Sequence, residues 1–147
     1  MVKDAKEAQE LANELRPVLL RLARELRREI HSLGVTGGQV SLLESIKHSP
    51  GITATELAER ERVSAPAMSN QLSRLEAAQL IERTRGGDDR RRVGVSLSAE
   101  GHKVLRSVRQ KRTAWLSARL HNLSDAELAA IDDAIAPLAK LLEADPA

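Results

Sequence analysis

The stretch Arg83–Ser98, RTRGGDDRRRVGVSLS, holds five arginines, two adjacent glycines and two adjacent aspartates. In its second half, Val93, Val95 and Leu97 alternate with small residues, which is the period of a half-buried strand. Residues 80–85 form a second short strand-like run, so we predict a β-hairpin with an arginine-rich tip. Taken alone, the stretch could equally be a solvated charged loop, and its neighbours decide between the two.

Two short helices are predicted immediately before this hairpin. Thr53 followed by Glu56 indicates the start of a helix that runs through about Glu61. Ser64 is a typical N-cap for a second helix, from residue 65 to about 78, with Pro66 tolerated in its first turn. Helix, turn, helix and two strands in this order are typical of a winged helix-turn-helix. We therefore predict a mainly α-helical chain with a small β-hairpin wing.

The second of these helices has one apolar face and one free face. Met68, Leu72 and Leu75 are spaced by four and three, and we expect them to pack on the first helix around its small residue Ala58. The free face has no acid before Glu76. Asn and Gln can pair with adenine edges in the major groove, and Ser can reach phosphate. The predicted DNA-binding residues of this helix are Ser64, Ala65, Pro66, Ala67, Ser69, Asn70, Gln71, Ser73 and Arg74.

The free face of the second helix could also be an ordinary solvated surface, and the helix alone does not decide. The arginine-rich wing beside it favours DNA binding. Residues 83–92 carry a net charge of +3, whereas the whole chain carries only +2. An arginine side chain can enter a narrow A·T-rich minor groove, and the adjacent aspartates can orient a guanidinium before it does so. The predicted DNA-binding residues of the wing are Arg85, Asp89, Arg90, Arg91 and Arg92.

The two ends of the chain are predicted to be long amphipathic helices. A first helix spans about residues 5–33, with Pro17 expected to kink or interrupt it, and two helices fill 98–145. Their apolar stripes are longer than a small middle domain could cover, so we expect a homodimer. The alternative is that the end helices pack only on each other. The predicted interface residues are Leu11, Leu15, Leu128, Ile131, Ile135, Leu138 and Leu142.

Several motifs taken in order resemble the MarR (multiple antibiotic resistance regulator) family of transcription factors, over essentially the whole chain. They are Thr36-x-x-Gln39, Thr53-x-x-Glu56-Leu-Ala58, Asp89-x-Arg91, and Val95-x-Leu97-Ser98-x-x-Gly101. The resemblance implies one domain over 1–147, with residues 36–97 as its DNA-binding part. It implies a homodimer that binds a pseudo-palindromic operator, usually as a repressor. It also makes Arg91 the minor-groove arginine, Asp89 its partner, and Arg90 and Arg92 auxiliary phosphate contacts.

The family's usual trigger is a small anionic or aromatic effector bound between the dimer helices and the winged part. Arg16, Arg109, Arg112 and Trp115 could contribute to such a site, or could equally be surface charges and a core tryptophan, so the sequence leaves the effector site unknown. The chain has no cysteine, which excludes disulfides and cysteine-based redox sensing.

Other function classes find less support in the sequence. The four histidines lack metal-ligand spacing, and we expect neither a metal nor a cofactor. No apolar run approaches a membrane span and no signal peptide is recognisable, so we expect a cytoplasmic protein. We expect no enzyme, because no nucleophile elbow or phosphate loop is present. A winged-helix module that binds an acidic protein instead of DNA stays open as the main alternative.

Overall fold

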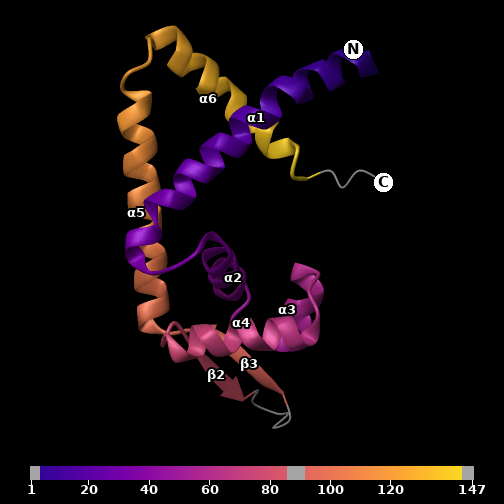
Figure 1. Cartoon of the computed structure of the whole chain (residues 1–147), viewed down its shortest axis with the longest axis vertical. Coiled ribbons are helices and arrows are strands. Elements are labelled where there is room, and N and C mark those ends of the chain that lie inside the picture. Colours follow the sequence, from indigo (N-terminus) through magenta and orange to yellow (C-terminus); the bar gives the residue numbers. More distant parts are fainter. Residues whose placement is uncertain (1–3, 86–91, 144–147) are drawn as a thin grey trace. The chain divides into compact units, whose positions relative to one another are not determined.

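Most of the chain is helical, with a small antiparallel sheet (Figure 1). The computed structural model describes residues 4–85 and 92–143. Two compact units, residues 1–112 and 113–147, meet within the fifth α-helix. In chain order the elements are α1 (Ala5–Glu29), η1 (His31–Leu33), α2 (Gly37–His48), β1 (Ile52–Thr53), α3 (Ala54–Glu61), α4 (Ala65–Ala77), β2 (Ile81–Arg85), β3 (Val93–Leu97), α5 (Ala99–Leu120) and α6 (Asp125–Lys140).

The helices begin at side chains that bond to the backbone, which confirms the predicted starts at Thr53 and Ser64. Thr36 and Gln39 form a reciprocal capping box at α2, with bonds of 3.1 and 3.0 Å. Ser64 Oγ accepts from the backbone N–H of Ala67 at the start of α4. Each cap satisfies a backbone donor that the first helical turn cannot pair. Short local motifs therefore fix where these helices begin.

The hydrophobic core of the first unit lies among α2, α3, α4 and the sheet. Met68, Leu72 and Leu75 on α4 are fully buried, as is Leu57 on α3. This confirms the predicted apolar face of α4, with Ala58 also buried where α3 and α4 pack. The turn between them is short because Arg62 adopts a left-handed conformation (φ 56°) at the end of α3. The helix-turn-helix is thus held by burial of one face of each helix.

The sheet has three strands in the order β1-β3-β2, one more than the predicted hairpin. β2 and β3 pair as expected, whereas β1 adds Thr53 opposite Gly94. A Cβ on Gly94 would lie 2.2 Å from the carbonyl oxygen of Gly51, so only glycine lets the two backbones approach this closely. Val93, expected on the buried side, is exposed because it lies at the far end of the strand.

The junction between β3 and α5 explains the Leu97-Ser98-x-x-Gly101 pattern. Ser98 Oγ accepts from the backbone N–H of Gly101 and donates to the carbonyl oxygen of Gln79, at 3.0 and 2.6 Å. A Cβ on Gly101 would lie 2.1 Å from the carbonyl oxygen of Leu80. The first turn of α5 is therefore locked against the chain segment that follows α4.

The predicted helix over 5–33 was too long. α1 ends at Glu29, and a 3-10 turn leads to Gly34 in the left-handed region (φ 75°). The apolar spacing continues beyond the end of α1 because Ile30 is fully buried in the core and Leu33 packs against it. The prediction therefore extended the helix too far. A kink or a boundary was expected at Pro17, and α1 is not interrupted there. None of the helices in the described ranges is both long and apolar enough to cross a membrane.

Candidate DNA-binding surface

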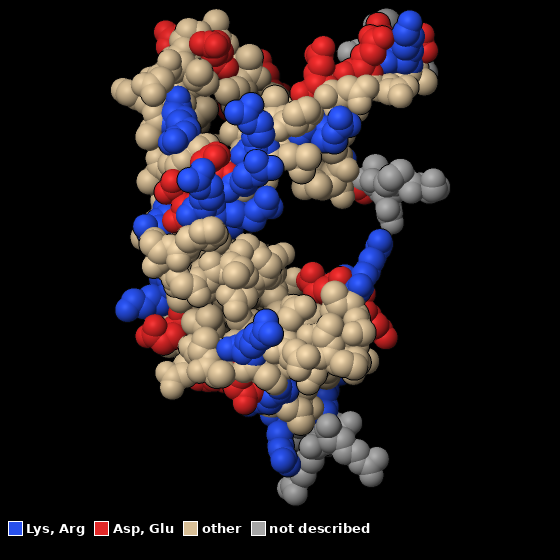
Figure 2. Space-filling view, in the orientation of Figure 1, with Lys and Arg blue, Asp and Glu red and all other residues tan. Residues whose placement is uncertain are grey.

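The polar face of α4, which we define as Ser69, Asn70, Gln71, Ser73 and Arg74, is exposed along its whole length. Ala65 and Pro66 at the start of the helix are exposed as well, while Ala67 is partly covered. Figure 2 shows a mainly uncharged surface over α4, with basic side chains on it and near the sheet. A helix face that is small, polar and free of acid can approach a nucleic acid without repulsion.

Two residues of this face border a hollow beside the start of α2. Gln71 and Arg74 line it together with Thr36, Gly38 and Gln39, and its volume is about 300 Å³. The hollow brings a cation, an amide and a helix N-terminus together. Helix N-termini attract anions through their dipole and free N–H groups, so this region favours a negatively charged partner.

The wing lies beside α4, because β2 contacts α4. Arg85, at the end of β2, is exposed, and so is Arg92 just before β3. The predicted wing residues Asp89, Arg90 and Arg91 lie outside the described residues. The strand β2 of the wing thus packs against the helix that carries the polar face.

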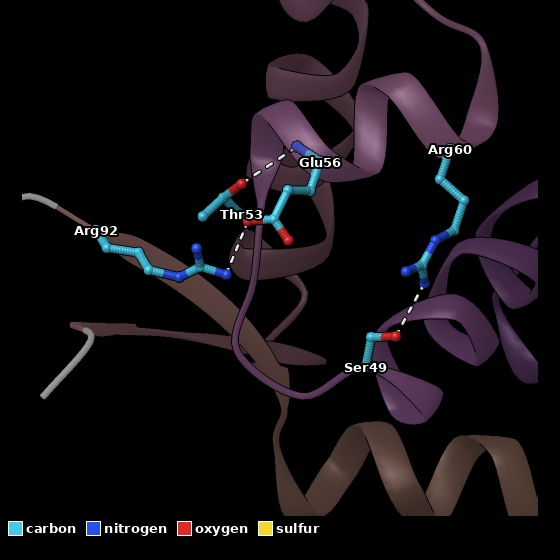
Figure 3. Close-up of polar contacts among 5 residues, drawn as sticks. All are labelled: Ser49, Thr53, Glu56, Arg60 and Arg92. Carbon is cyan, nitrogen blue, oxygen red and sulfur yellow. Dashed lines mark hydrogen bonds and ion pairs between the residues drawn. The ribbon is translucent and has the colours of Figure 1, made fainter.

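Two wing arginines form ion pairs with glutamates of the helix-turn-helix. Arg83 on β2 pairs with Glu76 on α4. Arg92 Nη2 lies 2.7 Å from Glu56 Oε1 on α3 (Figure 3). Sequence reasoning placed Arg92 among DNA contacts and missed both glutamates as partners. Their spacing in the sequence, 7 and 36 residues, gave no local signal, and only the packing of the strands on the helices brings them together.

The predicted interface residues lie on α1 and α6, except Leu142, which follows the end of α6, and several of them are exposed in the single chain. Leu11 on α1 is 57% exposed, and Ile135 and Leu142 at the end of the chain are 61% and 90% exposed. Leu15, Leu128 and Leu138 are partly covered and Ile131 is exposed. Further large exposed apolar residues on α1, which the prediction left out, are Val18, Leu19, Leu20 and Leu22.

A second hollow, of about 500 Å³, lies among α1, α2 and α5. Of the four residues considered for an effector site, only Arg112 lines it, together with Arg27 and Glu44. The Nε atom of Arg112 is buried and bonds to no other described residue. Sequence reasoning missed Arg27 and Glu44, because facing helices bring them together and no motif marks them.

The other three residues considered for an effector are engaged or exposed elsewhere. Arg16 donates to Asn13 on its own helix, and Arg109 is exposed. In the second unit Trp115 is buried, and the Arg119 guanidinium lies 3.8 Å from its ring centroid, a cation–π distance.

Comparison with known proteins agrees with this arrangement of helices and wing. The model of the MarR family matches residues 35–93, which span the helix-turn-helix and most of the wing. A helix-turn-helix transcriptional regulator of Mycobacterium tuberculosis is 33% identical over 117 residues, covering 80% of this chain and 82% of that protein. The chain belongs to the MarR family. It is therefore a transcriptional regulator with a DNA-binding helix-turn-helix.

Two further proteins are similar over most of the chain. The transcriptional repressor MdtR of Bacillus subtilis is 31% identical over 131 residues, covering 89% of this chain and 84% of MdtR. A mutant of S. aureus MepR, solved bound to an oligodeoxyribonucleotide, superposes with a TM-score of 0.70. It shares 22% identity and covers 90% of this chain and 96% of MepR, so it supports the fold alone.

Proposed function

We propose that this MarR-family regulator binds a pseudo-palindromic operator as a homodimer, represses transcription, and is released by a small-molecule effector. The observation that carries the proposal is the exposed, acid-free polar face of α4 beside an arginine-flanked wing. A recognition helix in the major groove, with a wing arginine in the adjacent minor groove, would read one half-site. The two half-sites of the operator would match the two-fold symmetry of the dimer.

Within this proposal the side chains divide by what they would contact. Asn70 and Gln71 would read base edges, and Arg74 would bind a phosphate from the hollow at the start of α2. In the wing, Arg91 would enter the minor groove with Asp89 as its partner, as the family resemblance implies. Arg85 would contact backbone phosphate, because it is exposed at the end of β2.

The exposed apolar residues of α1 and α6 support the homodimer. Residues such as Leu11 and Ile135 would be covered by the same helices of a second copy. The relative MdtR is named a transcriptional repressor, which supports repression as the activity of this chain. Membership of a family of regulators with a DNA-binding helix-turn-helix supports the choice of double-stranded DNA as the partner.

Release by an effector is supported by the hollow among α1, α2 and α5. Two cations, Arg27 and Arg112, line it, and the buried Nε of Arg112 offers a donor that no described residue uses. A small anion would satisfy that donor. An effector bound there would shift α1 and α5, the helices that continue toward the proposed dimer contacts. Coupling between such sites is typically about 1–3 kcal/mol, which would change DNA affinity about 5- to 150-fold.

The test is a selection of bound fragments from the source genome, followed by affinity measurements on the selected duplex. Arg91→Ala should weaken binding strongly on every A·T-flanked site. Asn70→Ala should lower discrimination at the base it contacts, by about 1–3 kcal/mol. Selection of no sequence, together with retention of an acidic protein partner, would favour the alternative of a protein-binding winged helix.

A further inference from the structure

Both strands of the wing are tied to the helix-turn-helix by an ion pair. On β2, Arg83 pairs with Glu76 of α4, the helix whose polar face is exposed. Just before β3, Arg92 pairs with Glu56 of α3 across 2.7 Å. The two flanks of the wing are therefore each paired with a different helix, so a shift of the wing on α3 and α4 would oppose both ion pairs.

The position of Glu56 is itself fixed by the sheet. Its backbone N–H donates to Thr53 Oγ1 at 3.2 Å, which caps α3, and Thr53 pairs with Gly94 in the β1–β3 ladder. Gly94 stands two residues after Arg92. A short closed path of strand pairing, helix cap and ion pair thus connects β3 to α3, and Figure 3 shows the Arg92 guanidinium directed toward this helix start.

An exposed arginine in a DNA-binding wing has two alternative roles. Arg92 could leave Glu56 and bind a phosphate, since an ion pair whose side chains are 49% and 44% exposed is weak. That exchange would leave the Glu56 carboxylate unpaired beside an arriving polyanion. Keeping the pair intact neutralises Glu56 and holds the wing in place, which reduces the ordering cost of binding. Among the described residues Arg85 forms no ion pair, so it can supply a phosphate contact at no such cost.

We propose that Glu56 and Arg92 form a brace that fixes the wing on the helix-turn-helix, so that Arg92 positions the wing and does not itself bind phosphate. This inference rests on the proposed DNA-binding role and departs from the phosphate contact that the family resemblance implied for Arg92. Recognition of DNA by the wing would then depend on α3, a helix that carries no predicted base contact.

The experiment measures affinity for one duplex, selected from a random pool by the unaltered protein, at a series of salt concentrations. The variants are Glu56→Gln, Arg92→Gln, the double variant, and the reversed pair Glu56→Arg with Arg92→Glu. Glu59→Gln is the matched control for Glu56, because it removes the same charge from the exposed surface of the same helix. Arg85→Gln is the matched control for Arg92. Thermal unfolding of each variant and titration of its active fraction separate weaker binding from poorer folding.

The brace predicts that Glu56→Gln and Arg92→Gln each weaken binding about three- to fivefold, the upper range for an exposed pair. The double variant should be no weaker than either single variant, because both remove the same interaction. The reversed pair should bind within about twofold of the unaltered protein. The slope of log affinity against log salt should stay unchanged in Arg92→Gln, but become shallower by about one per chain in Arg85→Gln.

Three results would overturn the brace: tighter binding by Glu56→Gln, a shallower salt slope in Arg92→Gln, or a reversed pair weaker than both single variants. Each would mean that Arg92 meets phosphate directly. A change in unfolding temperature with unaltered affinity of the active fraction would also overturn it, by showing a purely structural pair. Failure of the unaltered protein to select any duplex would instead refute the proposed function.

Discussion

Large apolar side chains are buried in the segment from α2 to β3, whereas many of those on α1 and α6 are exposed. In the first, the apolar faces of α2, α3, α4 and the sheet close on one another, and Leu43, Leu57 and Leu72 are fully buried. On α1 and α6, by contrast, Leu11 and Ile135 remain mostly exposed in the single chain. The winged part thus buries its apolar faces within one chain, whereas α1 and α6 keep large apolar side chains exposed.

The largest effect is expected in the closed core. Leu72→Ala should lower the free energy of unfolding by about 2–5 kcal/mol, because it leaves a cavity between α4 and its neighbours. Chemical denaturation measures this value. Ser73→Ala, the next residue on the exposed side of α4, is the control and should change stability by less than about 0.5 kcal/mol. A loss of similar size in both variants would mean that the two faces of α4 are wrongly assigned.

Substitutions at exposed apolar residues of the end helices should weaken association of two chains and should not disturb the core. Ile135→Asp should weaken the proposed dimer about 100-fold or more, because one apolar side chain is lost from each of two chains. Sedimentation over a range of protein concentrations measures this change. Ala130→Asp places the same charge on another exposed side of α6 and should leave association nearly unchanged. A chain that is already monomeric near micromolar concentration would contradict the dimer.

Two glycines of the winged part test how closely it is packed. Gly94→Ala should cost about 1–3 kcal/mol, because the new Cβ would overlap the carbonyl of Gly51. Gly38→Ala, inside α2, meets nothing closer than 3.9 Å and should be neutral or stabilising by about 0.5–1 kcal/mol. Thermal unfolding of the two variants compares them directly. Equal stability of both would show that β1 does not pack on β3 as described.

Gly94 also marks the limit of what the sequence could predict. The helix starts at Thr36, Ser64 and Ser124 were predictable because each cap joins residues three apart in the chain. The short strand β1 was missed, although a glycine inside a strand pattern is a recognised sign of close backbone approach. The pairs of Arg83 and Arg92 with glutamates depend on how strands pack on helices, and no local pattern encodes that.

The smallest expected effect is a difference in pH dependence between the two capping boxes, one at the start of α2 and one at the start of α6. At α2 the box uses Gln39, which does not titrate, whereas at α6 it uses Glu127. Hydrogen bonds from the backbone N–H and then the side chain of Ser124 hold the pKa of Glu127 below the ordinary value of a glutamate. A lowered folded-state pKa gives stabilisation that is present above the unfolded value and is lost as the pH falls through the folded value.

Acidification should therefore loosen the start of α6 and leave the start of α2 intact. Titration of the Glu127 side chain by NMR measures its pKa directly, and amide exchange near Ser124 and Thr36 compares the two helix starts. Ser124→Ala removes the hydroxyl but keeps the backbone N–H, so it should move the pKa of Glu127 only part of the way back toward its ordinary value. An unaltered pKa in that variant would show that the Ser124 hydroxyl does not contribute to the shift.

The central claim is that the polar face of α4 and the arginine-flanked wing together bind DNA. The most direct measurement is the affinity of the unaltered protein for a selected duplex, by fluorescence anisotropy, as a function of salt concentration. If arginines such as Arg74 and Arg85 contact phosphates, log affinity should fall steeply and linearly with log salt, by about 0.9 per phosphate contact. An affinity that stays flat with salt would contradict the claim.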